Sequence, residues 1–468
     1  MDIEIPLENK KEESLTDWYN EVIEKAELCD KRYPIKGMNV WYSYGLAIMK
    51  NIDALLRKEV EEMGYQEVQF PVLIPKNEFM KEAEHIKGFE NYVYWVTHAG
   101  KNELDIPLAL RPTSETAMYP IFSLWVRSHS DLPLRVYQIA EVFRYETKQT
   151  RAFMRVREIH FFEAHTCHTD FEDAEKQVEE DLKIMEKFSK ALSIPYLQCK
   201  RPEWDKFAGA FYSIGLDAVM PNKKTNQIGS IHHYKDNFSR PYNIKYEDLD
   251  GKQKYVHQTT YGMSERLLGA IIGIHGDNRG LVLPPKIAPY QIVIVPVLLK
   301  SHKKEIEKRA KELLNRLLEL GFRVKLDERD LRPGSKYYYW EIRGVPIRIE
   351  IGLKEFMENN ITIVRRDTFE KTNVKLKSKN ILSIIKDILE DIERNLMKKA
   401  EELMKEGIIE VRKKEEIANL DGILRAGWCG KEECGLEIEK LGDFGILGID
   451  VKSKENMNCI ICNEKGKV

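Results

Sequence analysis

Hydrophobic residues recur at helical spacing in two segments near the start of the chain, residues 14–29 and 44–63. The second segment ends at Gly64, and glycine is favoured just beyond a helix because it tolerates a left-handed backbone. Between the two segments, residues 34–39 have the composition of a turn. The first part of the chain is therefore predicted to begin with two amphipathic helices.

Other segments alternate between apolar and polar positions or form short apolar runs, which predicts strands. Residues 134–146 alternate in this way, and residues 156–165 are the expected return strand. Residues 67–75 form an apolar run whose prolines, Pro71 and Pro75, indicate an edge or an end of a strand.

A boundary is predicted at residues 284–289 (PPKIAP), because three prolines within six residues interrupt both a helix and a central strand. Beyond it, apolar runs alternate with a helical period, and strand–helix–strand order is typical of an α/β module with parallel pairing. The expected strands are 291–299, 322–326, 344–351 and 361–364, and the expected helices are 303–320 and 382–405. A glycine-rich segment follows the last helix.

Composition and charge refine this division. The chain has 468 residues, 43% of them hydrophobic, which excludes a disordered protein and allows about three domains. The net charge of -2 hides an asymmetry, because residues 291–400 carry 25 Lys and Arg against 17 Asp and Glu, a net of +8, and the remainder carries -10. We therefore expect one basic module, suited to a polyanionic partner, on a mildly acidic body.

The N-terminal residues 1–6 have no basic stretch before an apolar core, so no signal peptide is expected. No run approaches the roughly 20 apolar residues of a membrane span. The cysteines are unevenly placed, with four of the seven, Cys429, Cys434, Cys459 and Cys462, near the end of the chain. Their two pairs fit a closed structural zinc site, whereas free buried thiols are the alternative. We expect a cytoplasmic protein without a membrane span.

Charged residues cluster on the two strands predicted at 134–146 and 156–165. With a period of two, Arg144 and Glu146 face the same side, and Phe161 and Glu163 share a face of the return strand. Such a hairpin is suited to binding one ligand between a guanidinium, carboxylates and an aromatic ring. It is equally typical of a surface ladder of ion pairs, and the spacing leaves both interpretations open.

Nucleotide-binding signatures of the GxxxxGK[ST] and GxGxxG types are absent, as is HExxH. Other motifs carry a resemblance, and they are RPTSET (111–116), FRYE (143–146), YGMSER (261–266) and HGDNRGLVLPP (275–285). Together they resemble the class II aminoacyl-tRNA synthetases. The stretches KGFE (87–90), YWVTH (94–98) and RPEWDKF (201–207) are similar to the prolyl branch of archaeal and eukaryotic type.

The resemblance implies an α+β protein with three parts: an antiparallel-sheet catalytic domain (1–286), an α/β anticodon-binding domain (287–400) and a small C-terminal zinc-binding α/β domain (401–468). It implies ATP-dependent activation of L-proline to prolyl-adenylate, transfer to the 3′ end of tRNA(Pro), Mg²⁺ with the ATP, structural Zn²⁺, and a homodimer. Residues 166–260 are too few to add a large inserted editing domain. The alternatives are a class II paralogue that charges another small amino acid, and a tRNA-binding paralogue without activation chemistry.

The resemblance also implies roles for individual residues. Arg144 and Arg266 are the expected catalytic cations, because guanidinium groups bind phosphate oxygens in pairs. The residues expected to bind ATP are Arg144, Glu146, Arg155, Gln227, Ser230 and Arg266, with Gln227 acting directly or through Mg²⁺. Those expected to bind proline are Thr113, Glu115, Arg144, Phe161, Glu163, His232 and Ser264. From the residues alone, Thr113 and Glu115 are more typical of a helix cap followed by a first-turn acid than of a ligand site.

In the basic module, DERDLRPG (327–334) and WEIRGVPIR (340–348) are similar to the anticodon-binding domain of the same enzymes. Glu341 and Arg366 are predicted to read guanine edges, although the arginine is also suited to a phosphate, and 327–334 is also typical of a plain turn. The chain departs from the family pattern at SIHHYK (230–235), at Phe161, and at its end, Lys467–Val468, where archaeal-type members have a tyrosine. These departures are the basis for the two alternative functions.

Overall fold

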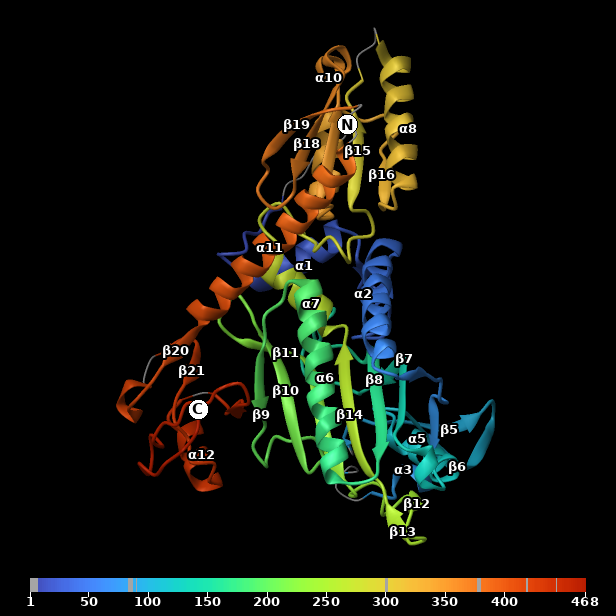
Figure 1. The fold of residues 1–468 in the computed structure, drawn as a ribbon, viewed down its shortest axis with the longest axis vertical. Helices are drawn as coiled ribbons and strands as arrows, with labels where there is room; N and C mark the ends of the chain where they lie inside the picture. Colours follow the sequence, from blue (N-terminus) through green and yellow to red (C-terminus); the bar gives the residue numbers. More distant parts are fainter. Residues whose placement is uncertain are drawn as a thin grey trace.

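The structure is a computed structural model of the chain, and it describes residues 7–82, 87–89, 91–298, 302–376, 380–417, 420–442 and 444–468. Residues 1–6, Glu90 and Leu299, which were used above, lie outside these ranges. Figure 1 shows a large sheet with helices across it, a second sheet at one end of the molecule, and a C-terminal segment beside the large sheet. Within the described residues, no helix combines the length and the apolar character that crossing a membrane requires.

The large sheet has eight strands and is antiparallel apart from its last pair, as expected for the catalytic core. The two strands predicted as a hairpin are confirmed, but the first ends at Phe143 and the second begins at Glu158, so Arg144 and Glu146 lie just beyond the strand. In sheet order the strands are β22 (Ile449–Asp450), β9 (Leu197–Lys200), β10 (Tyr212–Val219), β11 (Thr225–Lys235), β14 (His257–Ser264), β8 (Glu158–His168), β7 (Leu134–Phe143) and β3 (Gln66–Glu67).

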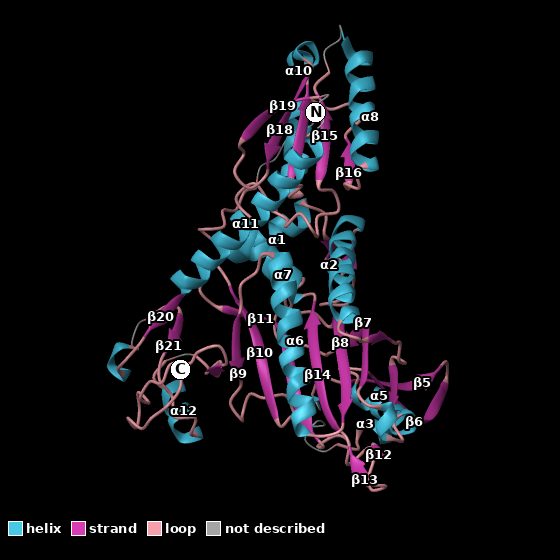
Figure 2. Ribbon diagram, in the orientation of Figure 1, coloured by secondary structure: helices cyan, strands magenta, loops and turns pink. Residues whose placement is uncertain are grey.

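Helices cover one face of this sheet (Figure 2) and bury their apolar side against it. They are α1 (Leu15–Lys25), α2 (Ser43–Glu62), α6 (Phe171–Leu192) and α7 (Arg266–His275), and the first two confirm the predicted helices. The longest of the four, α6, was not predicted. It starts at the cap residue Asp170, which accepts a hydrogen bond from the backbone of Asp173, and it buries Met185 and Phe188 in the core.

The predicted strand 67–75 is wrong as a single element. Its start, β3, pairs with β7, whereas its end, β4 (Leu73–Pro75), belongs to a three-stranded sheet with β6 (Asn102–Leu110) and β5 (Tyr94–Ala99). Pro71 lies between the two pieces, where a missing N–H interrupts a ladder. Two helices lie beside the small sheet, α3 (Lys76–Phe79) and α5 (Glu115–Trp125).

The remaining short elements of this part of the chain are the 3-10 helix η1 (His129–Asp131) and two strand pairs, β1 (Cys29–Asp30) with β2 (Val40–Trp41) and β12 (Lys245–Glu247) with β13 (Gln253–Tyr255).

The basic segment forms a five-stranded sheet with its own apolar core. Parallel pairing is confirmed for β15 with both neighbours, but the last two strands pair antiparallel. The order is β16 (Val324–Leu326), β15 (Ile292–Pro296), β17 (Ile347–Ile351), β18 (Asn360–Arg365) and β19 (Lys371–Lys375), with α8 (Lys303–Glu319), α9 (Pro333–Ile342) and α10 (Leu353–Glu358). Three of these, β19, α9 and α10, were not predicted, and α9 takes over the end of the predicted turn 327–334.

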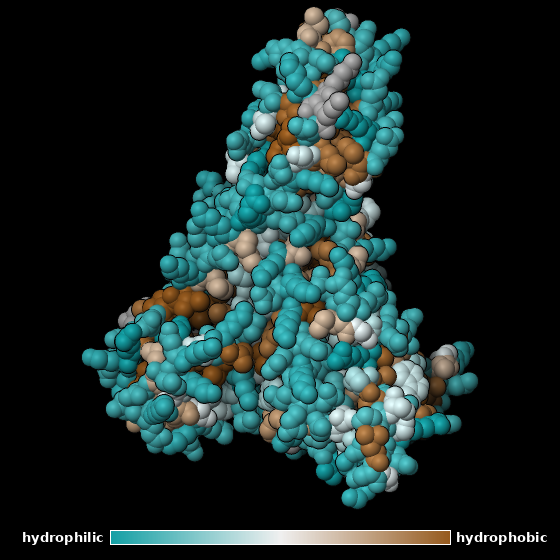
Figure 3. Space-filling view, viewed as in Figure 1, coloured by the Kyte–Doolittle hydropathy of each residue, from teal (hydrophilic) through white to brown (hydrophobic). Residues whose placement is uncertain are grey.

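Helix α11 (Ile381–Gly407), close to its predicted bounds, leads from the second sheet to the C-terminal segment (Figure 1). That segment holds β20 (Ile408–Glu410), η3 (Lys414–Glu416), β21 (Ile423–Arg425) and α12 (Glu432–Glu439), and its last strand, β22, joins the large sheet at β9. Trp428 and Trp204 of the two parts meet with ring centroids 5.9 Å apart. On the face drawn in Figure 3 the surface is mostly hydrophilic, and hydrophobic residues gather where this segment meets the rest of the chain.

Candidate active site

A cavity of about 400 Å³ opens on the face of the large sheet opposite α6, over β8, β11 and β14. Every residue that the resemblance implies for proline or ATP lines it. These are Thr113, Glu115, Arg144, Glu146, Arg155, Phe161, Glu163, Gln227, Ser230, His232, Ser264 and Arg266. The structure thus brings together residues that are up to 153 positions apart in the sequence. Their individual roles stay predictions.

Three arginines, Arg144, Arg155 and Arg266, meet in the cavity, which carboxylates also line. Burial and the neighbouring Arg266 lower the pKa of Arg144 to about 10. Burial and the neighbouring Arg155 likewise lower the pKa of Arg266. Backbone carbonyls hold two of the guanidinium groups in place, since Arg144 Nε donates to Pro112 O at 2.9 Å and Arg266 Nε donates to Met154 O at 2.8 Å. Mutually repelling, preorganised cations of this kind form a site for an anion.

Glu115 lies at the first turn of α5 and is 2% exposed. One of its carboxylate oxygens accepts a hydrogen bond from the Thr113 hydroxyl at 2.6 Å, and the other accepts one from the Tyr234 hydroxyl at 2.8 Å. The first-turn alternative is right about position, but the capping alternative is wrong: Ser114 is the cap residue, and the Thr113 hydroxyl donates to Glu115 instead of accepting from the helix backbone. The carboxylate is fixed and faces the cavity.

Glu163, on β8, is held from several sides. Burial opposes its ionisation, but hydrogen bonds with His165, Ser114 and Gln138 hold the pKa of Glu163 below its usual value. Its Oε2 lies 3.3 Å from His165 Nε2, and Gln138 Nε2 donates to its Oε1 at 2.9 Å. Glu163 is therefore an ionised carboxylate, held in place by its neighbours, that lines the cavity.

The remaining wall is apolar and aromatic. Phe161 lies over Gly262 of the neighbouring strand, where a Cβ would come within 3.1 Å of the phenyl ring. The ring of His232 lies 4.6 Å from Phe207, and burial lowers the pKa of His232 to about 4. Its nitrogens contact Ser213 Oγ at 2.7 Å and Ser230 Oγ at 3.0 Å. A neutral, orientated imidazole and two aromatic rings suit a small apolar group.

The surface ion-pair ladder considered for the hairpin is wrong. Within the described residues, two ion pairs span it, Arg155 with Glu146 at 3.8 Å and His160 with Glu141 at 3.2 Å, whereas Arg144, Glu146, Arg155 and Glu163 line the cavity. Arg157 lies outside the cavity, because β8 begins only at Glu158 and the Arg157 guanidinium stacks 4.4 Å from the Tyr145 ring.

Sequence reasoning gave no role to several residues that complete the site. Tyr234 bonds Glu115 and accepts a hydrogen bond from Thr260 at 2.8 Å, although its position was noted only as a departure from the family pattern. Arg201 lines the cavity and binds Asp217 at 2.8 Å. Arg201 lies in RPEWDKF (201–207), which is similar to a motif of the prolyl branch. The motif could therefore have indicated Arg201 as a site residue, although its pattern assigns no role to the arginine.

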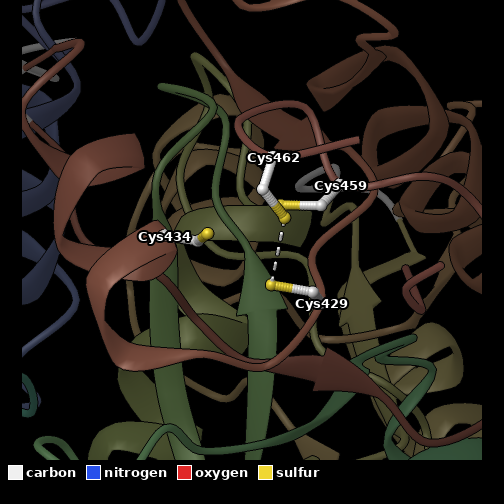
Figure 4. Close-up of side chains that lie close together, drawn as sticks. All are labelled: Cys429, Cys434, Cys459 and Cys462. Atoms are coloured by element: carbon white, nitrogen blue, oxygen red, sulfur yellow. Dashed lines mark hydrogen bonds between the residues drawn. The ribbon is translucent and has the colours of Figure 1, made fainter. Parts of the chain in front are cut away.

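The four C-terminal cysteines converge, as predicted. Their Sγ atoms all lie within 4.8 Å of one another, and those of Cys429 and Cys462 are 3.8 Å apart (Figure 4). Four thiolates placed tetrahedrally about 2.3 Å from one zinc ion would lie about 3.8 Å from each other, so the donor set fits that metal. Burial opposes ionisation of Cys459, but backbone N–H groups of Cys462 and Ile461 lower its pKa to about 7.

Glu341 and Arg366 lie close together in the basic module, but both are already paired. The Arg366 guanidinium donates to both carboxylate oxygens of Asp277 at 2.7 Å, and it is 3% exposed. Glu341 accepts from Arg348 at 2.6 Å and from Arg279 at 3.2 Å. Because Asp277 and Arg279 directly follow α7, these pairs join the basic module to the catalytic sheet.

Comparisons with known proteins agree with this geometry. Residues 94–275 match the family model "tRNA synthetase class II core domain (G, H, P, S and T)", and residues 291–388 match "Anticodon binding domain". The fold and the cavity are thus those of a class II aminoacyl-tRNA synthetase.

Relatives over the whole length define the branch. The chain is 52% identical to the proline–tRNA ligase of Thermococcus kodakarensis, with 98% of each chain covered, and 50% identical to that of Methanosarcina mazei, with 97% and 95% covered. The structure superimposes on Giardia lamblia prolyl-tRNA synthetase in complex with prolyl-adenylate with a TM-score of 0.93 at 32% identity, covering 99% and 98% of the two chains. The chain belongs to the proline–tRNA ligase family.

Proposed function

We propose that the chain activates L-proline with ATP in the cavity described above and transfers the prolyl group to the 3′ end of tRNA(Pro). In the first step a proline carboxylate oxygen attacks the α-phosphorus of ATP, the bond to the β-phosphate oxygen breaks, and pyrophosphate leaves with the electron pair. The carboxylate is already ionised, so no general base is needed. Catalysis therefore consists of positioning two anions and stabilising the charge on the phosphate.

One observation carries this proposal: Arg144 lies between a pocket lined by carboxylates and aromatic rings and a region with two further arginines. We assign the proline carboxylate and the α-phosphate to Arg144 and the terminal phosphates to Arg155 and Arg266. Burial and then mutual repulsion lower the pKa values of Arg144 and Arg266, and binding of these anions would offset both.

For proline, Glu115 is assigned to the secondary ammonium group, and Phe161 and His232 to the ring. Thr113, Ser264 and Glu163 complete the pocket. The neutral state of His232 supports this assignment, because a second cation beside the ammonium group would weaken binding.

For ATP, Glu146 is assigned to the adenine amine, and Gln227 and Ser230 to the ribose and phosphate region, with Mg²⁺ bound through the phosphates. Magnesium supplies charge neutralisation when bound.

The domain division at residues 286 and 400 is part of the proposal. The basic module, with its net charge of +8, is assigned to the anticodon end of the tRNA. Glu341 and Arg366 stay candidates for reading guanine, with the condition that tRNA binding must compete with their present partners.

The four cysteines are assigned to structural zinc. Support comes from the fit of their sulfur spacing to a tetrahedral thiolate site. The metal would supply folding energy to a segment with a small apolar core of its own. Metal analysis of the purified chain, with Cys434→Ser as the comparison, is the direct measurement.

A homodimer is supported by large apolar side chains exposed on α5 and the small sheet. Leu124 is 57% exposed, Ile106 48% and Trp125 45%. Contiguous exposed apolar patches, unlike single exposed side chains, mark interfaces. Light scattering should give twice the chain mass, and Leu124→Glu should reduce it.

The test of the activity is proline-dependent exchange of labelled pyrophosphate into ATP. Exchange with proline and not with other small amino acids is expected, and Arg144→Ala should abolish it while tRNA binding stays near normal. Arg240→Ala is a matched control, because Arg240 is an exposed arginine paired with Asp236, and neither residue lines the cavity. Absence of exchange with proline would overturn the proposal, and exchange with another amino acid would select a different class II ligase.

A further inference from the structure

A second cavity, of about 450 Å³, lies beside the first and has a different character. The two share Met154, Arg155, Gln227 and Arg266, so the second begins where the terminal phosphates of ATP are assigned. The rest of its lining comes from α1, from the loop between β7 and β8, and from the turn between β10 and β11 with the first residues of β11.

The charge of the second cavity is of one sign. Arg151, Arg155, Lys224 and Arg266 line it, and within the described residues no carboxylate does. The first cavity, in contrast, includes several carboxylates among its lining residues. Arg151 donates from Nη2 to Thr16 Oγ1 at 3.1 Å, which fixes the side chain and leaves the guanidinium its charge. Hydroxyl and amide groups of Thr150, Thr225, Asn222 and Asn226 supply further donors.

The lining favours a compact inorganic anion over RNA. Tyr19 is the single aromatic side chain among the described lining residues. It is 2% exposed, and its hydroxyl donates to Ala152 O at 3.0 Å. No ring is therefore available to stack on a base, which single-stranded RNA recognition normally requires. Small polar donors around an acid-free cavity match phosphate oxygens instead.

We propose that the second cavity is a pyrophosphate site, which receives the leaving group of the activation step after it separates from the α-phosphate. This inference rests on the proposed function and adds to it a product site that is distinct from the triphosphate site. Pyrophosphate passes from Arg155 and Arg266, shared by both cavities, to Arg151 and Lys224, which line the second cavity alone. Lys224 is exposed and marks the opening to solvent.

The test uses the full-length protein saturated with a non-hydrolysable prolyl-adenylate analogue and titrated with pyrophosphate in a calorimeter. Arg151→Gln and Lys224→Gln should each weaken pyrophosphate binding about tenfold, and together about a hundredfold, because each removes one charge-assisted contact. The KM for ATP should change less than about twofold. Lys223→Gln is the matched control, since Lys223 lies in the same turn but does not line the cavity, and its affinity should equal that of the wild type.

Each other outcome contradicts the proposal. Unchanged pyrophosphate affinity in the double variant would show that pyrophosphate does not bind in this cavity. A rise in the KM for ATP that parallels the loss of pyrophosphate affinity would show that the cavity is part of the triphosphate site and not a separate product site. A rise in the KM for tRNA with unchanged pyrophosphate affinity would make it a site for the RNA backbone. Because the titration needs no turnover and is repeated on the protein without the analogue, a chain without proline-dependent exchange would fail the proposed function and still report on this cavity.

Discussion

Three arginines of the main cavity face one another, whereas the arginine predicted to read the anticodon is paired within the chain. Arg144 and Arg266 have lowered pKa values because burial and a neighbouring guanidinium both disfavour their charge. Arg366 is at least as buried, but both of its terminal nitrogens donate to Asp277. The first arrangement is completed by an anionic ligand, and the second is complete without one.

Net charge would suggest the opposite assignment of the anion sites, with the anion at the module around Arg366. The module around Arg366 has a net charge of +8, and the rest of the chain, which includes the main cavity, has -10. Net charge describes which surface attracts a polyanion at long range, but the pairing of individual charges describes where an anion is held. The two regions therefore call for different experiments.

Among the variants that test this contrast, the largest effect is expected from Glu115→Gln. The amide keeps the shape of the side chain but removes the charge assigned to the proline ammonium, and leaving a buried charge without its partner costs about 3–4 kcal/mol. The kcat/KM for proline in pyrophosphate exchange should fall by about 10²- to 10³-fold. Glu103→Gln, an exposed acid on β6, is the control. A fall of less than about threefold in the Glu115 variant would mean that the cavity is not arranged around proline.

A smaller effect is expected where the pairing is complete. Asp277→Ala and Arg366→Ala should each reduce the kcat/KM for tRNA aminoacylation about tenfold, because each breaks the junction between the module and the segment after α7. The double variant should be no worse than either single one. If Arg366→Ala is impaired and Asp277→Ala is not, then Arg366 reads a base directly, and the contrast between the two regions disappears.

The sequence was most informative where function and local pattern coincide. The β7–β8 pair, α1, α2, α8 and α11 follow from periodicity, and the cavity residues follow from ordered motifs. The split of residues 67–75 between two sheets was not predictable, because an apolar run does not say which partner each end will find. Helix α9 was not predicted for a different reason: its tyrosine-rich stretch has only a weak apolar stripe, so the helical period is hard to detect.

Long-range pairing is the part of the site that no local pattern contains. Arg366 and Asp277 are 89 positions apart, and Tyr234 and Glu115 are 119 apart. The contact with Asp277 occupies Arg366, which is predicted to read RNA. The contact with Tyr234 fixes Glu115, which is predicted to bind proline. Residue type and motif indicated the candidates, but the fold decides which charges stay free for a ligand.

The smallest effect concerns pH and again separates the two regions. Burial lowers the pKa of His232 to about 4, so the imidazole is neutral well above that pH and gains a proton only as the pH falls toward it. Arg144, with a pKa of about 10, stays charged up to about pH 9. The KM for proline should thus vary less than about threefold between roughly pH 6 and 9 and rise below roughly pH 5, where a protonated His232 repels the proline ammonium. His232→Gln should remove that acidic rise. The salt dependence separates the two regions in the opposite sense. Raising the salt concentration should increase the KM for tRNA, which depends on exposed cations of the module, and leave the KM for proline nearly constant.

The pH dependence also has an outcome that contradicts the contrast. If the KM for proline instead titrates near 6.5, the ordinary pKa of histidine, then His232 is open to solvent and the cavity is less closed than the contrast requires.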